Sequence, residues 1–326
     1  MPRHYETKWQ MDTIVLTDAE QALFDSLPGP PVEAVIKTTS IWIIEWLPIS
    51  DKRTGRLLHE WMQERRPGWS NYSECASKLE VVSSIERAAN LAKKSRIIPV
   101  LHLEAHGDEN GLGGPDGNGG MVLLSWDEFT EPLQRLNLAT RCNLIVVVAA
   151  CIGFAGIKAL VRGPRAPAIA LVGPDASIKD SSLLYGTKEI YRRWMDNDPR
   201  LDEIAISASR EAGTVSFEWE PFTVLAYDAV AERLIFSMRQ AQQRMQVNRI
   251  RQRMLEEDRW STAEIERRLS LLSPSVQATL IQQQWDKMFM IDLYPENRER
   301  FGVNWSEIVD LVLSSQIRLK QLDKGT

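Results

Sequence analysis

Two residues of this sequence could act together as a nucleophile and its base, Cys151 and His106. Each comes at the end of a short apolar run, residues 97–103 before His106 and residues 143–150 before Cys151. A thiolate attacks a carbonyl carbon, whereas a thiol does not, and a neighbouring imidazole can accept the thiol proton. The pair therefore predicts cysteine-dependent chemistry on a carbonyl group, such as the cleavage of a peptide bond.

The sequence around the pair predicts that both residues lie at the carboxyl ends of buried parallel strands. Open parallel sheets bind their ligands beyond these strand ends. Glycines stand close by: Gly107 leaves room for a substrate backbone, and Gly153 permits a tight turn after Cys151. The backbone N–H groups of Gly107 and Cys151 are candidates for an oxyanion hole.

The other histidines and cysteines nearby are weaker candidates. His102 competes for the role of base, because regular alternation along a strand points it the same way as His106. Cys142 begins a strand and Cys75 lies in a polar stretch, so neither is expected to be catalytic. Taken singly, a cysteine after a strand usually packs in the core, so it is the combination with histidine that supports the hypothesis.

The order of the predicted elements indicates an α/β fold. Central strands are expected at residues 40–47, 97–103, 143–150 and 168–173, and helices at 57–64, 77–94, 125–136, 154–161, 181–195 and 201–212. Strands that alternate with helices form a mostly parallel sheet with helices on both faces. Ser125 with Glu128 forms a capping box that marks one of the helix starts.

The chain is expected to divide into three parts. Residues 1–31 form an N-terminal extension, residues 32–222 form the α/β domain, and residues 223–326 form an all-helical C-terminal region. Helix starts are expected at 261–264, 273–274 and 304–307, and one long helix at 225–254. The Arg- and Gln-rich stretch 239–253 is either a solvated helix face or a docking surface for a partner.

Composition and charge exclude several classes of function. The chain has 326 residues, a net charge of −5 and a sequence pI near 5.6, so direct nucleic-acid binding is not expected. Its three cysteines lack metal-ligand spacing and suit a reducing compartment, and we expect neither a metal nor another cofactor. Without a signal peptide or an apolar run long enough to span a membrane, the sequence predicts a cytoplasmic protein.

Two segments of the chain resemble the caspase-like cysteine peptidases of clan CD, in particular the bacterial caspase-like and CHAT-type proteins. These segments are residues 101–107 (LHLEAHG) and 144–153 (LIVVVAACIG), and the resemblance extends over about residues 35–215. It implies that residues 32–222 form a caspase-like peptidase domain, with His106 as general base and acid and Cys151 as nucleophile. Ala149 stands where caspases proper carry Gln, which argues against caspase-type aspartate specificity and leaves the dyad intact.

The same resemblance gives an expectation for the substrate. In several relatives an acidic residue after the strand that follows the cysteine lines a pocket for a basic side chain, and Asp175 and Asp180 occupy that region here. The alternative is that both lie in a solvated loop or cap a helix. Glu104 and Asp108, near the histidine, are candidates for orienting it or for meeting the substrate.

The expected function is therefore a cysteine endopeptidase that cleaves a protein substrate. A partner is expected to regulate it through the helical C-terminal region, and the resemblance suggests a bacterial defence or cell-death system. One alternative is a caspase-like fold that serves as a non-catalytic protein-interaction module. A second is an unrelated nucleotide or small-molecule binder, but the sequence has no Gly-x-Gly-x-x-Gly or P-loop motif, and no Gly-x-Ser-x-Gly motif of a serine hydrolase.

Overall fold

The computed structural model describes residues 16–31, 38–157, 164–196, 200–213, 215–241 and 274–323. The chain forms two compact units. One comprises Pro31–Leu225 together with Asp286–Gly302, and the other comprises Met1–Pro30, Ala226–Trp285 and Val303–Thr326. The first is the α/β unit and the second is helical in its described residues.

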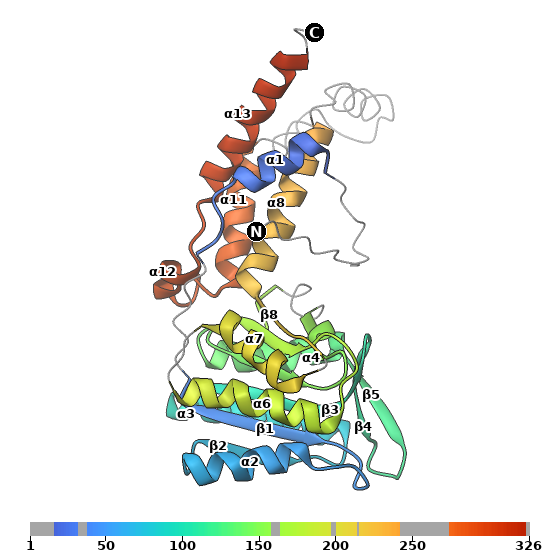
Figure 1. Cartoon of the computed structure of the whole chain (residues 1–326). Coiled ribbons are helices and arrows are strands. Elements are labelled where there is room, and N and C mark those ends of the chain that lie inside the picture. The colour runs from blue at the N-terminus through green and yellow to red at the C-terminus, as the bar shows by residue number, and fades with distance from the viewer. Residues whose placement is uncertain are drawn as a thin grey trace, which may run out of the picture. The chain divides into compact units, whose positions relative to one another are not determined.

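The α/β unit is built on a mostly parallel sheet (Figure 1). The strands lie in the order β2-β1-β3-β6-β7-β8, and only β8 runs antiparallel to its neighbour. A hairpin of β4 and β5 pairs with the end of β3. The strand bounds are β1 Ser40–Trp46, β2 Ser70–Glu74, β3 Pro99–Asp108, β4 Gly111–Pro115, β5 Met121–Ser125, β6 Ile145–Ala149, β7 Ala170–Pro174 and β8 Phe217–Pro221.

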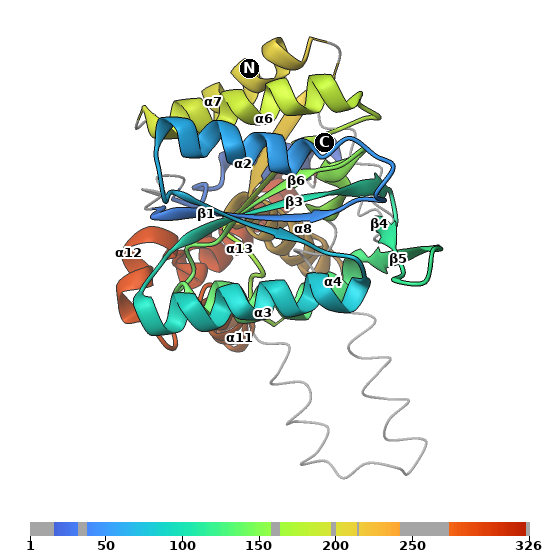
Figure 2. The same ribbon diagram turned by 90° about the horizontal axis from the view of Figure 1, so that it is seen from below.

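Helices cover both faces of this sheet (Figure 2). On one face lie α2 (Thr54–Arg65), α6 (Asp180–Met195) and α7 (Leu201–Ala212), and on the other lie α3 (Lys78–Ser95) and α4 (Trp126–Ala139). Because the sheet is covered on both sides, β1 and β6 are buried along their whole length. The predicted mostly parallel α/β fold, with helices on both faces and a helical C-terminal region, is confirmed.

Local sequence signals explain where several helices begin. Ser125 and Glu128 form the predicted capping box at the start of α4, and Thr17 and Glu20 form another at the start of α1 (Asp18–Ser26). Each pair satisfies backbone N–H groups that the first helical turn leaves without partners. Ser77 caps α3 in the same way, by accepting a hydrogen bond from the Glu80 N–H.

The two edge strands of the main sheet, β2 and β8, lie where the sequence predicted no strand. β2 is polar, because it is an edge strand that pairs only with β1, and it therefore lacks the apolar run of a central strand. β8 is the opposite edge of the sheet, and its middle residues are only half-buried.

The glycine-rich stretch after His106 forms β4 and is partly buried. A Cβ at Gly114 would lie only 2.3 Å from the Trp46 ring, so the strand packs closely here because it lacks side chains.

The C-terminal helices are α8 (Phe222–Ala241), α11 (Pro274–Met288) and α13 (Trp305–Asp323). Pro274 and Asn304 stand at the predicted helix starts, and the Glu307 N–H donates to the Asn304 side chain. The predicted start at 261–264 lies outside the described residues, as do residues 158–161 of the predicted helix 154–161. The described part of that helix includes the short 3₁₀ helix η1 (Gly153–Gly156). None of the helices described is long and apolar enough to cross a membrane.

The segment Asp286–Gly302 belongs to the α/β unit although it comes late in the chain. It includes the 3₁₀ helix η2 (Pro295–Asn297) and the short helix α12 (Arg298–Phe301). The Phe289 ring packs against the rings of Phe222 and Phe301. Arg165 forms an ion pair with Asp292 at 2.8 Å, and this pairing lowers the pKa of the Asp292 carboxyl. The late segment is thus fixed to the α/β unit by aromatic packing and by an ion pair.

Candidate active site

The register of two neighbouring strands brings the ends of β3 and β6 to the same level of the sheet. Glu104 of β3 stands opposite Ala149 of β6. His106 comes two residues after Glu104, and Cys151 comes two residues after Ala149. A Cβ added at Gly107 would lie 2.5 Å from the Cys151 carbonyl oxygen. The strand end that carries the histidine therefore packs directly against the backbone of the cysteine, and this packing requires glycine at position 107.

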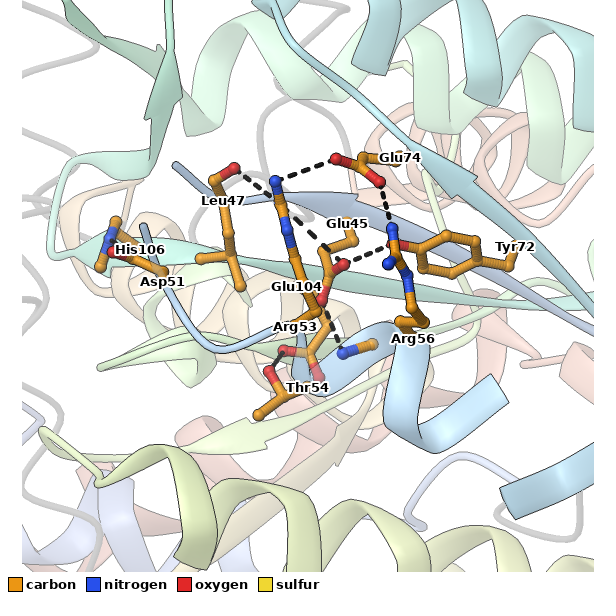
Figure 3. A network of polar contacts seen from close by, with 11 residues as sticks. Glu45, Leu47, Asp51, Arg53, Thr54, Arg56, Tyr72, Glu74, Glu104 and His106 are labelled. Carbon is orange, nitrogen blue, oxygen red and sulfur yellow. Dashed lines mark hydrogen bonds and ion pairs between the residues drawn. The ribbon is translucent and has the colours of Figure 1, made fainter. Parts of the chain in front are cut away.

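His106 lies where β3 leaves the main sheet and pairs with β4. Its side chain is 54% exposed, and its Nε2 lies 2.7 Å from the Asp51 Oδ2 (Figure 3). A carboxylate can only accept a hydrogen bond, so Nε2 carries the hydrogen. Nδ1, for which the described residues offer no hydrogen-bond partner, is then the nitrogen available to accept a proton.

Asp51 is the residue of this site that the sequence analysis missed. It lies in the loop between β1 and α2, beyond the carboxyl end of the strand next to β3. The available signal was positional: Asp51 follows a buried strand at the same edge of the sheet as His106 and Cys151. Asp51, His106 and Cys151 thus lie toward the carboxyl ends of three adjacent strands, β1, β3 and β6.

Cys151 is the most accessible of the three cysteines. It is half-buried, and its Sγ lies 3.7 Å from the Ile178 carbonyl oxygen, which accepts the thiol hydrogen bond. Cys75 and Cys142 are both buried. Burial raises the pKa of the Cys75 thiol, and it raises that of Cys142 to about 12, so neither forms a thiolate near neutral pH.

The turn after β6 adopts an uncommon backbone conformation. The Gly153 N–H donates to the Ala150 carbonyl at 3.0 Å, and between them Ile152 has φ 54° and ψ 29°. The left-handed residue of the turn is therefore Ile152, and not Gly153. Gly153 is needed for a different reason, because a Cβ there would lie 2.4 Å from the Val148 carbonyl oxygen. A β-branched residue at positive φ is strained, and strain of this kind concentrates at functional sites.

The loop after β7 borders this turn and carries the two predicted substrate-binding aspartates. The Ile152 N–H donates to the Ala176 carbonyl at 3.1 Å, and the Ile178 carbonyl is the partner of the Cys151 thiol. Asp175 lies at the start of this loop, and Asp180 follows it as the first residue of α6; both are exposed. The structure therefore brings the loop that carries them against Cys151.

Asp175 also lies near a second carboxylate, Glu218 of β8. The pKa of Glu218 is raised, mainly by burial and secondly by the charge of Asp175. Asp175, Asp180 and Glu218 therefore place several acidic side chains around the loop that borders the Cys151 turn.

The remaining candidates near the histidine are engaged elsewhere. His102 is fully buried, and its Nδ1 lies 2.8 Å from the Tyr191 hydroxyl, so it does not compete for the role of base. Glu104 is buried and accepts a hydrogen bond from the Thr54 hydroxyl at 2.9 Å. Asp108 accepts hydrogen bonds from the N–H groups of Asn110 and Gly111. The carboxylate that contacts His106 is Asp51, and not either of the two carboxylates that the sequence analysis considered.

The oxyanion-hole role of the Gly107 and Cys151 N–H groups stays a prediction. Across the described ranges, no three His, Cys, Asp or Glu side chains gather closely enough to hold a metal ion.

Comparison with known proteins gives little further guidance. No model of a known protein family matches the chain, and no curated protein matches it either. Among solved structures, the chain is similar to the complex of Porphyromonas gingivalis RgpB pro- and mature domains, with 12% sequence identity and a TM-score of 0.35. The match covers 63% of this chain and 53% of that chain. The similarity therefore spans about half of that chain, and it identifies neither a family nor an activity.

Proposed function

We propose that this protein is a cysteine endopeptidase with Cys151 as its nucleophile and His106 as its base. The observation that supports this most strongly is the register of β3 on β6, together with the packing of Gly107 on the Cys151 carbonyl. Ligands of parallel sheets bind at this edge. The accessibility of Cys151 and the backbone strain at Ile152 point to the same place.

In the proposed reaction, His106 Nδ1 removes the proton of the Cys151 thiol, and the thiolate attacks the carbonyl carbon of the substrate peptide bond. The C–S bond forms, the C–N bond breaks, and the His106 imidazolium gives its proton to the departing amine. Water then attacks the thioester, transfers a proton to His106 and releases the carboxylic acid with the regenerated thiol. Asp51 fixes the ring so that Nδ1 is the accepting nitrogen, and it stabilises the imidazolium.

The proposed substrate is a protein segment with a lysine or arginine before the cleaved bond. Support comes from Asp175 and Asp180 at either end of the loop whose Ile178 carbonyl contacts the Cys151 thiol, and from the nearby Glu218. Opposite charges favour the binding of a basic side chain here.

Cleavage of a mixed peptide library, followed by mass spectrometry of the new termini, tests this proposal. The wild-type protein is expected to cleave after lysine and arginine, and Cys151→Ala and His106→Ala to lose cleavage while keeping wild-type melting temperatures. Asp175→Asn and Asp180→Asn are expected to weaken the basic preference. Equal cleavage by the wild type and both dyad variants would refute the proposal. A wild type that cleaves nothing would favour the non-catalytic interaction module.

We further propose that a protein partner regulates this activity through the helical C-terminal region, within a bacterial defence or cell-death system. Support comes from the resemblance in the sequence and from the Arg- and Gln-rich stretch 239–253. Chemical cross-linking of the full chain in its native host, compared with a variant whose arginines in 239–253 are replaced by glutamate, tests this. The expected result is a partner that the variant loses; an unchanged set of cross-linked proteins would contradict it.

A further inference from the structure

The loop that carries Asp51 is exposed and needs support from elsewhere to keep its carboxylate on His106. It spans residues 47–53 between β1 and α2, and Ile49 within it is almost fully exposed. The loop has only two short internal contacts at Asp51, from its own N–H to the Pro48 carbonyl and from the Ser50 hydroxyl to its Oδ1. A half-buried aspartate on such a loop would adopt several positions if the ends of the loop were free to move.

Arg53 closes this loop at its base (Figure 3). Its Nη1 donates to the Leu47 carbonyl at 2.8 Å, which joins the last residue of the loop to the first. Its Nη2 forms an ion pair with Glu74 of β2 at 2.9 Å, and its Nη1 lies 4.0 Å from the Glu45 carboxylate. The Arg53 side chain is only 17% exposed and the Glu45 side chain is fully buried, whereas the Glu74 side chain is 40% exposed.

The support beneath Arg53 is a buried carboxylate. Glu45 of β1 is fully buried and accepts hydrogen bonds from the Gly55 N–H at 2.7 Å and from the Tyr72 hydroxyl. Thr54, next to Arg53, donates to Glu104 of β3, the strand that also carries His106. The base of the loop is therefore joined to β1, β2 and β3 together.

We infer that Arg53 is a positioning residue, which holds the loop between β1 and α2 closed so that Asp51 stays on His106. The expected effect of Arg53 on catalysis rests on the proposed function, whereas its effect on the position of Asp51 does not. The guanidinium is required, because its fork reaches the Leu47 carbonyl and Glu74 at once, whereas the single ammonium group of lysine cannot reproduce this arrangement.

A matched control is available one helical turn away. Arg56 shares the same partner, since its Nη2 lies 2.7 Å from Glu74, and its guanidinium lies over the Tyr72 ring. It bonds Glu74 without bonding the Leu47 carbonyl. Arg53→Met and Arg56→Met therefore both remove a cation from Glu74, and only Arg53→Met opens the loop.

The first test is the NMR spectrum of the His106 ring in the full chain. The ring ¹H and ¹⁵N resonances in Arg53→Met are expected to move toward those of Asp51→Asn, and Arg53→Lys to move the same way by less. Arg56→Met is expected to keep the wild-type resonances. Wild-type resonances in a folded Arg53→Met protein would overturn the inference, whether or not the protein proves to be a peptidase. If Arg53→Met does not fold, Arg53→Lys decides by the same criterion.

The second test is a double-mutant cycle on cleavage rate. Arg53→Met alone is expected to lower kcat by about tenfold to a hundredfold, because a small misplacement of a catalytic group has this effect. In an Asp51→Asn background the same change is expected to lower kcat less than twofold, since Arg53 acts through Asp51. Full additivity of the two changes would contradict the inference. If Arg53→Met shifts the His106 ring resonances as expected but the wild-type protein cleaves no peptide, the positioning role of Arg53 is supported and the proposed function is overturned.

Discussion

The two sides of the candidate site are built differently. On the histidine side, His106 contacts Asp51, whose loop is closed by Arg53 and supported by the buried Glu45. On the cysteine side, Cys151 has one long sulfur contact, to the Ile178 carbonyl, and lies in a turn strained at Ile152. His106 is thus held by a hydrogen bond to a charged side chain on a supported loop, whereas Cys151 is held mainly by its backbone.

This difference fits the roles that we propose for the two residues. A base must present one nitrogen in one tautomer, which fixed hydrogen bonds achieve. A nucleophile must move between thiol, tetrahedral adduct and thioester, and a side chain with few contacts can do so at little cost. The loop that contacts the thiol also carries Asp175 and leads directly into Asp180, the first residue of α6.

The largest effect is expected on the histidine side, from Asp51→Asn. An amide in this place no longer stabilises the imidazolium or fixes its tautomer, so kcat should fall by about 10²- to 10⁴-fold with a small change in KM. Glu109→Gln, a change at an exposed carboxylate in the turn between β3 and β4, serves as the control and should leave kcat unchanged. Steady-state kinetics on a cleaved peptide provides the measurement, and equal kcat values for the two variants would show that Asp51 has no role.

A smaller effect is expected where the two sides meet, from Gly107→Ala. The added Cβ would lie 2.5 Å from the Cys151 carbonyl oxygen, so the protein should lose about 1–3 kcal/mol of unfolding free energy. Gly113→Ala is the matched control, because its Cβ would meet His106 at an ordinary 3.7 Å. Urea denaturation of both variants measures the difference. If the two glycines tolerate alanine equally well, the strand ends are not in close contact.

On the cysteine side, Ile152→Gly should relieve the left-handed strain of the turn. The unfolding free energy is expected to rise by up to about 1 kcal/mol, because glycine adopts positive φ without steric cost. Cleavage should slow at the same time, since the turn holds Cys151 less firmly. A clear loss of stability in thermal and urea denaturation would show that the isoleucine packing outweighs the strain.

The smallest expected effect is a pH dependence of stability that comes from Glu45, the buried residue beneath Arg53. Burial raises the pKa of the Glu45 carboxyl, so between the unfolded and folded pKa values the folded state binds a proton that the unfolded chain has lost. This contribution to stability is fully present below about pH 4.5 and falls as the pH rises through the folded pKa. Glu45→Gln should lack this decline. Melting temperatures of both proteins from pH 4 to 8 test the sign, and parallel curves would contradict it.

Much of the fold was predictable, because the apolar runs of β1, β3, β6 and β7 are buried on both faces and leave a clear signal. The polar edge strand β2 was not predictable, since it pairs through its backbone and its side chains show no apolar pattern facing the core. The adjacency of His106 and Cys151 was inferred from strand ends and stays a prediction, and the register of β3 on β6 brings these two strand ends to the same level. Asp51 was missed because a loop carboxylate has no periodicity, and only the pairing of β1 with β3 brings it to the histidine.

The central claim is that His106 serves Cys151, and the rate of Cys151 alkylation tests it most directly. Iodoacetamide is added to the wild type and to His106→Gln at pH 7, and labelling of each cysteine is followed by mass spectrometry, with the buried Cys75 and Cys142 as internal controls. We predict that Cys151 labels first in the wild type, and at least about tenfold more slowly in His106→Gln, because the imidazole takes up the thiol proton. Equal rates of Cys151 labelling in the two folded proteins would contradict the account.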